Sequence, residues 1–308
     1  MALVTLCDPQ VNEQGRELTR HGSALFPIAC YHDALSLGAV PWHWHPELEV
    51  FTVSGGTAIA AAGAERFAVC SGQGFFVNTQ VLHAVWPQKG SDCRLHSAVF
   101  HPRLVGGNLD SVFWSKYLQP LLNEGGPPCV HLDGGEDWHA DAVCAVEQAW
   151  TGCVQESPGY EFQAREGLSR LIFLLSRHHV HASSSKPDSL LREESRVKLM
   201  LEYIHQHYDK KLNTAVIARA AAVSESECLR CFRRIIGMPP IQYVTQYRIQ
   251  KAAELLMSAP ELSVAEVGAR CGFQDASYFT KTFHALKEFT PSEYRRQERS
   301  NFLYGLKK

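Results

Sequence analysis

The sequence lacks the features of a membrane-spanning or exported protein. None of its hydrophobic runs approaches the roughly 20 apolar residues that a membrane-spanning helix needs. The N-terminal stretch Met1–Pro9 has no basic residue and no long apolar core, so it does not have the pattern of a secretory signal peptide. Ten cysteines are scattered along the 308 residues, and without an export signal we expect them to be reduced thiols. These absences predict a cytoplasmic protein without a membrane partner.

A second pair of closely spaced cysteines is also missing. Cys228 and Cys231 form a single CxxC, whereas a structural zinc site usually needs two such pairs. Both cysteines fall where a helix would carry apolar residues, which favours packing in a core. A redox or metal-binding role for this pair is the alternative.

The net charge of the chain is small but unevenly distributed. It is −2 over the whole chain, but residues 191–308 hold 19 Lys and Arg against 13 Asp and Glu, a net +6. Residues 1–190 hold the other 11 basic and 19 acidic residues, a net −8. This asymmetry predicts that only the C-terminal part contacts nucleic acid.

The region 25–135 has the pattern of a small antiparallel β domain. Short segments rich in apolar and β-branched residues, such as Glu47–Val53 and Arg94–Phe100, are separated by glycine-containing turns such as Ser54–Gly56. Several short strands at close spacing predict a sandwich or barrel. Residues 1–24 have no such pattern, and we interpret them as a loose lead-in.

Potential metal ligands are concentrated within this β region. His43 and His45 are separated by one residue, Glu49 follows after three more, and His83 lies on a later segment. This spacing resembles the first motif of the cupin superfamily, and His83 resembles the histidine of its second motif. The resemblance implies a cupin-like barrel whose four matching residues would bind a metal, and imidazole with carboxylate suits Zn, Mn, Fe or Ni. The sequence departs from the pattern at Gly38, one residue closer to the first histidine than usual.

The same residues also admit interpretations without a metal. Histidine and tryptophan offer flat apolar faces with one polar group, which suits the wall of a small-molecule pocket. In that interpretation the effector pocket is lined by His43, His45, Glu49, Phe51, His83 and Trp86. Simple packing of these side chains is the third alternative.

Between residues 136 and 180 the apolar period changes to that of helices. Trp138, Val143, Val146 and Trp150 recur at steps of three to five, and Ser157–Gly159 separates this stretch from a second helix. Two amphipathic helices must bury their apolar faces, either against the barrel or in a dimer interface. The polar, proline-containing segment 181–190 is predicted to be an interdomain linker.

The C-terminal region contains an internal repeat. Residues 214–232 and 265–283 align at a constant offset of 51 positions, and the correspondence continues beyond them. The matching pairs are Ala218 and Ala269, Arg219 and Arg270, Ser226 and Ser277, Arg230 and Lys281, Phe232 and Phe283, Pro240 and Pro291, and Tyr243 and Tyr294. A constant offset over seven pairs predicts a duplicated supersecondary unit.

Each copy has the signals of a helix-turn-helix, whose second helix enters the major groove of DNA. The predicted helix caps are Thr214 and Ser224 in the first copy and Ser263 and Asp275 in the second. The predicted turns are at Val223–Ser224 and Gly272, and Gly237 is expected to end the first recognition helix. A long helix, about 241–257, joins the two copies.

At this point the sequence resembles a known family. The runs 272–283 and 290–295, with Arg230, Phe232, 237–240 and Tyr243 of the first copy, are similar to the signature of AraC/XylS-type transcription regulators. The resemblance implies a DNA-binding domain at 191–297, a basic tail at 298–308 and a ligand sensor in the barrel at 25–135. The sequence departs from the family at Glu288, where glycine is usual, and at Lys281, where arginine is common. Lysine would make a point-charge contact instead of a forked one.

Helix geometry and the family pattern together assign the DNA contacts. The residues expected to face bases are Ser226, Leu229 and Arg230 in the first recognition helix and Ala276, Ser277, Thr280 and Lys281 in the second. Arg230 is the best suited, because a guanidinium can bond O6 and N7 of guanine together. The residues expected at phosphates are Arg233, Arg234, Lys251, Arg295 and Arg296. The two helices are expected to enter major-groove segments about 34 Å apart.

These patterns predict an α+β protein of two domains: an N-terminal antiparallel β-barrel (cupin-like) followed by helices, and a C-terminal all-α double helix-turn-helix. The predicted function is a non-enzymatic, sequence-specific transcription regulator whose barrel binds a small-molecule effector. The expected partners are promoter DNA, the effector, a second copy in a homodimer and, for an activator, RNA polymerase. No cofactor is certain, and a divalent metal in the barrel stays open. The alternatives are a cupin-fold metal-dependent enzyme, or a metal or redox sensor, with an attached DNA-binding domain.

Overall fold

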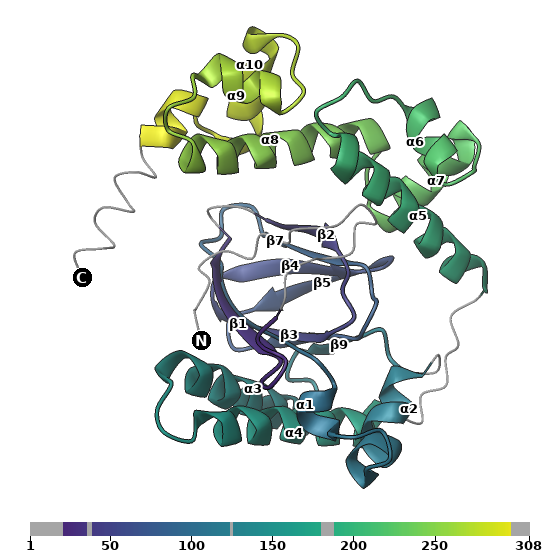
Figure 1. The fold of residues 1–308 in the computed structure, drawn as a ribbon, viewed down its shortest axis with the longest axis vertical. Helices are drawn as coiled ribbons and strands as arrows, with labels where there is room; N and C mark the ends of the chain where they lie inside the picture. Colours follow the sequence, from purple (N-terminus) through teal and green to yellow (C-terminus); the bar gives the residue numbers. More distant parts are fainter. Residues whose placement is uncertain (1–20, 36–38, 124–125, 180–187, 297–308) are drawn as a thin grey trace. The chain divides into compact units, whose positions relative to one another are not determined.

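The computed structural model describes residues 21–35, 39–123, 126–179 and 188–296 (Figure 1). The chain forms two compact units, Met1–Glu194 and Ser195–Lys308. The predicted tail at 298–308 lies outside the described residues, as do most of the lead-in at 1–24 and most of the linker at 181–190.

The N-terminal unit contains two antiparallel sheets, which confirms the predicted antiparallel β domain. Their strand orders are β1-β8-β3-β6-β9 and β2-β7-β4-β5. The strands are β1 (Ile28–Ala34), β2 (Val40–His43), β3 (Leu48–Gly55), β4 (Thr57–Ala62), β5 (Glu65–Cys70), β6 (Gly74–Val77), β7 (His83–Pro87), β8 (Arg94–Phe100) and β9 (Cys129–Leu132).

Strand β3 is buried on both of its faces. Leu48 and Val50 belong to a core shared with helices, whereas Phe51 and Val53 belong to the core between the two sheets. This alternation is the period of two that a strand imposes on its side chains. It places Glu49 on the inner face, with Phe51 and Val53.

Helices cover the outer face of the five-stranded sheet (Figure 1). They are α1 (Arg103–Gly106), α2 (Gln119–Leu122), α3 (Asp137–Gln155) and α4 (Tyr160–His179), with a π-helical turn, η1 (Trp114–Leu118), before α2. Trp138 and Val146 of α3 are buried in the same core as Leu48, and the indole of Trp150 donates to the Tyr31 carbonyl at 2.9 Å. Packing on the barrel, one of the two predicted roles for 136–180, is therefore observed.

The C-terminal unit is entirely helical among its described residues. Its helices are α5 (Asp188–His207), α6 (Thr214–Ala220), α7 (Glu225–Ile235), α8 (Pro240–Ser258), α9 (Val264–Arg270) and α10 (Ala276–Lys287). Helix α5 begins inside the segment predicted as a linker and crosses the boundary between the two units, so the prediction for residues 188–190 was wrong. In Figure 1, α8 runs from the α6–α7 pair to the α9–α10 pair.

Three of the four predicted helix caps are confirmed. The side chains of Ser224, Ser263 and Asp275 each accept a backbone N–H of the first turn of the helix that follows. Asn213 caps α6 instead of Thr214, because its side chain accepts from the Val216 N–H at 2.9 Å. Asparagine is as good a cap as serine, and the cap position is the last residue before helical dihedrals begin.

The repeat offset of 51 holds for the recognition helices but not for the helices before them. Thr214 and Val264, the first residues of α6 and α9, lie 50 positions apart, whereas Glu225 and Ala276, the first residues of α7 and α10, lie 51 apart. The second unit therefore has one more residue in its turn. Ala218 corresponds in space to Gly268, because the carbonyl of each accepts the matching turn N–H.

Two positions in each unit have left-handed backbone. In the turns these are Ala222 (φ 53°) and Gly272 (φ 82°), and after the recognition helices they are Gly237 (φ 89°) and Glu288 (φ 63°). The predicted glycine turn at Gly272 is confirmed, and the departure at Glu288 is accommodated as a left-handed C-cap. Each unit thus has one glycine and one strained non-glycine residue at equivalent places.

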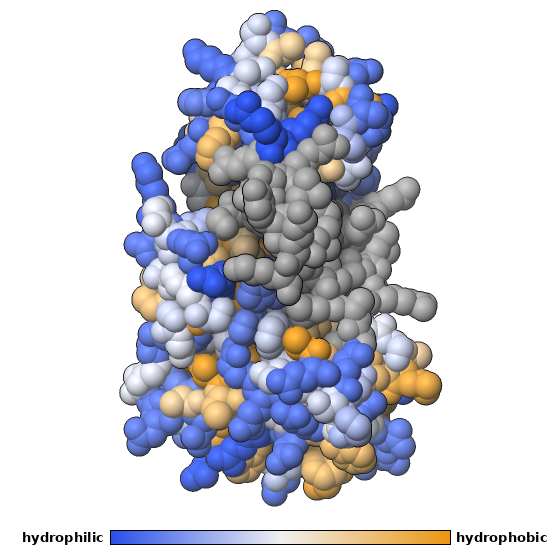
Figure 2. All heavy atoms as spheres, turned by 90° about the vertical axis from the view of Figure 1, so that its left-hand side faces the viewer, coloured by the Kyte–Doolittle hydropathy of each residue, from blue (hydrophilic) through white to orange (hydrophobic). Residues whose placement is uncertain are grey.

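Aromatic side chains form the core of the C-terminal unit. Phe232, Phe279 and Phe283 have no exposed surface, and Phe273 is 7% exposed, as predicted. Among the described residues no helix is long and apolar enough to cross a membrane. On the face drawn in Figure 2, the apolar surface of both units is broken into separate patches among hydrophilic residues.

Candidate functional sites

The first recognition helix, α7, presents a polar face to solvent. Ser226 and Arg230 are exposed and Leu229 is half-buried, and their spacing of three and four residues places them on one side of the helix. The opposite side carries Cys228 and Phe232, which have no exposed surface. The three residues predicted to face bases therefore share an accessible face.

Arg230 does not project alone from this face. Its Nε and Nη2 atoms donate to the two carboxylate oxygens of Glu227, at 2.9 Å and 2.7 Å. Arg196 of α5 donates to the same carboxylate at 2.7 Å. Hydrogen bonds from Arg230 hold the pKa of the Glu227 carboxyl below its usual range. The sequence analysis missed Glu227 and Arg196, although the three-residue spacing of Glu227 and Arg230 on a helix was a signal for an ion pair.

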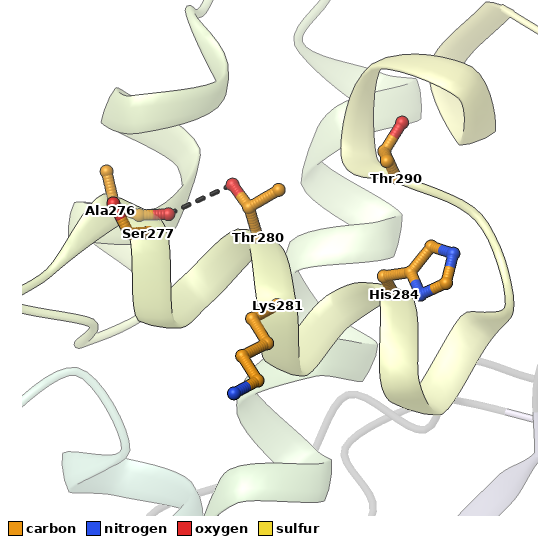
Figure 3. A pocket seen from close by; sticks show the side chains of 6 residues that line it. All are labelled: Ala276, Ser277, Thr280, Lys281, His284 and Thr290. Carbon is orange, nitrogen blue, oxygen red and sulfur yellow. Dashed lines mark hydrogen bonds between the residues drawn. The ribbon is translucent and has the colours of Figure 1, made fainter.

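The second recognition helix, α10, lines an open hollow of about 580 Å³ (Figure 3). The hollow is lined by Ala276, Ser277, Thr280, Lys281, His284 and Thr290. All four residues that we predicted to face bases in the second unit are among them. The Thr280 hydroxyl donates to the Ala276 carbonyl within the helix at 2.9 Å. His284 and Thr290 were missed, although His284 follows Lys281 at the spacing of one helical turn.

The cations predicted at phosphates differ in their surroundings. Arg233, Arg234 and Arg296 are exposed. Lys251 forms an ion pair with Glu254 at 2.7 Å, so it already has an anionic partner within its own helix. Arg295 is half-buried, and its Nε and Nη2 atoms are buried without a hydrogen-bond partner among the described residues. Exposure favours Arg233, Arg234 and Arg296 over the half-buried Lys251 and Arg295 as phosphate contacts.

The cysteine pair in α7 lies in the core. Cys228 and Cys231 have no exposed surface. Burial raises the pKa of the Cys228 thiol to about 11, so this thiol stays protonated at neutral pH. A reactive cysteine needs thiolate character and access, and this environment supports the packing interpretation.

The four potential metal ligands of the barrel lie together. One ligand atom from each of His43, His45, Glu49 and His83 falls within 4.8 Å of the others, and all four residues are buried. His43 and His83 are paired across β2 and β7, while Glu49 comes from β3 in the other sheet. The two sheets thus bring ligands together that are up to 40 residues apart in sequence.

Hydrogen bonds fix the orientation of the three imidazole rings. The Nδ1 atoms of His43, His45 and His83 lie 2.8, 3.2 and 2.8 Å from backbone carbonyl oxygens. A carbonyl oxygen can only accept, so each Nδ1 carries the proton and a neutral ring has its lone pair on Nε2. The Nε2 atoms of His45 and His83 nevertheless both lie 2.9 Å from Oε2 of Glu49.

Neutral rings and an ionised carboxylate would repel each other in this arrangement, because lone pairs would face lone pairs. Burial by itself would raise the pKa of the Glu49 carboxyl, whereas hydrogen bonds donated by rings that are also protonated at Nε2 hold the pKa well below its usual range. The contacts are favourable when positive charge lies at the centre, either as protons on the rings or as a metal cation. Histidine ligands of metals commonly donate their other ring N–H to a carbonyl, as all three do here.

The predicted effector-pocket residues are not all brought together. Phe51 lies beside the cluster, with its ring centroid 6.2 Å from that of His83. Trp86 does not, because β7 alternates and its inner face carries His83 and Val85. Trp86 instead pairs with Trp42 at 6.5 Å, and the guanidinium of Arg66 lies over both rings. The structure thus places Trp86 away from the other residues predicted for the pocket.

One further histidine lies beside the cluster. The ring centroids of His21 and His45 are 5.5 Å apart, and His21 Nδ1 is 2.8 Å from the hydroxyl of Tyr31. The sequence analysis placed His21 in the unpatterned lead-in, since nothing in its local pattern indicates a fold-back onto the barrel.

Two family models match the chain. An AraC-like ligand-binding domain matches residues 26–135, and a helix-turn-helix domain matches residues 217–297. These matches cover the β unit and both helix-turn-helix copies.

Relatives match over most of the chain. It is 31% identical to the HTH-type transcriptional regulator YdeC of Bacillus subtilis over 289 residues, which cover 93% of this chain and 97% of the relative. It is 31% identical to the HTH-type transcriptional activator RhaS of Shigella boydii over 270 residues, 85% of this chain and 90% of the relative. A crystal structure of an apo ToxT variant from Vibrio cholerae matches with a TM-score of 0.45 and 11% identity, over 90% of this chain and 98% of that one.

Proposed function

The chain belongs to the AraC family of helix-turn-helix transcription regulators, and on that premise we propose how its residues perform the task. Its relatives are regulators and not enzymes, so a catalytic role for the barrel is set aside. We propose that α7 and α10 read promoter DNA, and that an effector bound in the barrel controls this binding.

One observation carries the DNA-reading part of the proposal. Both recognition helices begin with a side-chain cap, bury an apolar stripe that includes phenylalanine and turn a largely polar face outward. A helix that enters the major groove needs such a face, with residues that can reach base edges. Arg230 is proposed to read a guanine, Ser277 and Lys281 to contact the second site, and Arg233 and Arg234 to bind phosphates.

Selection of duplexes from a random pool by the full chain tests this proposal. We expect enrichment of a defined sequence, with affinity that falls steeply as salt rises. Arg230→Ala should weaken the selected duplex by about 1–3 kcal/mol and relax the preference at one base pair. Arg233→Ala, at a proposed phosphate contact, should weaken all duplexes and lower the salt slope by about one.

Lys89→Ala, which removes an exposed charge from the N-terminal unit, is the control and should change neither. If no duplex is enriched by the wild-type chain, the proposed assignment of the two helices is wrong.

The direction of control is proposed from the relatives. RhaS is named a transcriptional activator, and we propose activation, with contact to RNA polymerase, for this chain as well. We also propose a homodimer formed through the helical segment 136–180. Transcription in vitro from a selected promoter fragment should rise when the chain is added, and sedimentation should give twice the monomer mass. A fall in transcription would make the chain a repressor.

The barrel cluster favours a metal as the effector, or as the group that anchors it. His43, His45, Glu49 and His83 would hold a divalent cation, whose charge resolves the contact between the Nε2 lone pairs and the Glu49 carboxylate. When bound, the metal supplies a fixed positive charge for a ligand. The chain itself orients the rings through its carbonyl groups and keeps water from them by burial.

Metal analysis of the full chain purified without chelator tests the cluster. We expect about one equivalent of Zn, Mn, Fe or Ni, which His83→Gln should remove. His139→Gln is the matched control, because His139 is a similarly buried histidine that pairs with Asp133 outside the cluster. If the wild-type chain neither contains nor takes up any of these metals, the cluster is the polar wall of an organic effector's pocket.

A further inference from the structure

We propose that Glu227 is a positioning residue that fixes the guanidinium of Arg230 and so sets the base preference of the first recognition helix. This inference rests on the proposed DNA-binding function. It adds a residue that would not itself contact a base, and it explains why Arg230 would select one base instead of contacting many.

The carboxylate of Glu227 binds one defined edge of the guanidinium. Its two oxygens accept from Nε and Nη2 of Arg230, a bidentate arrangement with a preferred plane. Arg230 would then contact guanine through another edge of its guanidinium, the one formed by Nη1 and Nη2. A long arginine side chain has many rotamers, and ordering it before DNA arrives reduces the entropy lost on binding.

Glu227 itself has a second arginine partner. Arg196 of α5 donates to Oε1 of Glu227 at 2.7 Å, so the carboxylate lies between two cations. The Glu227 side chain is 26% exposed, whereas that of Arg230 is 51% exposed. The Glu227 side chain is thus less accessible than that of Arg230. This is expected if Glu227 positions Arg230 and Arg230 contacts the DNA.

The Glu227 carboxylate binds other groups, although its position in α7 would also allow it to cap the helix. Glu227 is the third residue after the cap Ser224, the position from which a glutamate can return to the N-cap backbone N–H. Glu266 does this in α9, where its carboxylate accepts from the Ser263 N–H at 2.8 Å. In α7 the carboxylate instead accepts hydrogen bonds from Arg230, Arg196 and the Cys231 thiol.

Among the described residues, the second recognition helix has no corresponding support. The residues equivalent to Glu227 and Arg230 are Tyr278 and Lys281, and Tyr278 is 57% exposed. A lysine ammonium has no plane to orient. We therefore expect sharp base preference from the first unit and broader preference from the second.

The experiment compares full-length variants on duplexes selected by the wild-type chain. Each base pair of the first half of the site is replaced in turn, and the pair whose replacement weakens the wild-type chain but not Arg230→Ala is the one that Arg230 reads. Discrimination at that pair should be roughly 5- to 150-fold in the wild-type chain. In Glu227→Gln it should fall severalfold, toward the discrimination of Arg230→Ala, while the other positions keep their discrimination.

Glu225→Gln is the matched control, because Glu225 lies on the same turn of α7 and is exposed. Both variants remove one negative charge near the DNA, so both should bind all duplexes somewhat more tightly. Only Glu227→Gln should lose the preference at the Arg230 pair. Arg196→Met leaves Glu227 and Arg230 in place and should lose part of the same preference. It replaces Glu227→Gln in the test if that variant does not fold.

The outcomes separate this inference from the function on which it rests. If the wild-type chain and Arg230→Ala have the same base preferences, the reading role of Arg230 is wrong. If Arg230 reads a base pair and both Glu227→Gln and Arg196→Met keep full discrimination there, the positioning role of Glu227 is overturned. If Glu225→Gln and Glu227→Gln change the base preference equally, Glu227 acts only as a negative charge near the DNA. That result would overturn its positioning role as well.

Discussion

The two helix-turn-helix units share a backbone plan and differ in the chemistry of their recognition helices. Both have a capped first helix of seven residues, a left-handed turn residue, and a capped second helix that buries phenylalanine. The first unit presents an arginine paired to a glutamate, and the second presents small residues and a lysine around an open hollow. The comparison separates what the fold requires from what recognition requires, because the buried phenylalanines Phe232 and Phe283 are the same in both units whereas the exposed Arg230 and Lys281 differ.

The largest effect is expected where the two units are most alike. Phe232 and Phe283 are equivalent, and neither has exposed surface. Phe232→Ala and Phe283→Ala should each lower the free energy of unfolding by about 3–5 kcal/mol, because each leaves a cavity in a closed core. Denaturant unfolding of the two full-length variants measures this. Costs that differ by more than about 2 kcal/mol would mean that the two cores are not equivalent, within the spread such substitutions show.

A smaller effect is expected where the units differ in packing. A Cβ on Gly268 would lie 2.7 Å from a ring carbon of the buried Phe279, whereas Ala218 already carries a methyl at the equivalent place. Gly268→Ala should therefore destabilise the protein by about 1–3 kcal/mol, although alanine is the better helix former. Ala218→Gly is the reciprocal change and should cost about 1 kcal/mol through helix propensity alone. A stabilised Gly268→Ala would show that α9 and α10 can move apart at no cost.

The smallest effect is expected at the left-handed positions, and it has the opposite sign. Ala222 and Glu288 have φ values of 53° and 63°, where their partners in the other unit are Gly272 and Gly237. Ala222→Gly and Glu288→Gly should each stabilise the fold by about 0.5–1 kcal/mol, because glycine relieves the left-handed strain. The two gains should add in the double variant, since the two sites lie in different helix-turn-helix units. Thermal unfolding of the three variants measures the gains, and Gly237→Ala, a loss of similar size, is the control.

Sequence patterns predicted local features of this protein well. Periodicity and turn residues located the strands and helices, and Ser224, Ser263 and Asp275 were identified as caps because capping depends on neighbouring residues alone. The proximity of His43, His45, Glu49 and His83 was also predicted, through their resemblance to the cupin motifs. Resemblance to known families supplied the meaning of these patterns.

Features that depend on side-chain direction were predicted less well. Trp86 was placed in the barrel pocket, although the alternation of β7 turns it to the opposite face. The offset of 51 was extended to helices that match at 50, because identical residues concealed a one-residue difference in the turns. Composition and spacing do not record such differences, which appear only once hydrogen bonds fix the register.

The sequence by itself determined that this chain has two parts, a β domain and a duplicated helix-turn-helix region, because period, caps and repeat are local or pairwise properties of the chain. The tertiary structure alone decided how residues far apart act together. Only folding brings Glu49 of one sheet to His83 of the other, and only folding brings Arg196 of α5 behind Glu227. The physical reason is that hydrogen bonds and ion pairs act over a few ångströms, whereas these partners are separated by about thirty residues of chain.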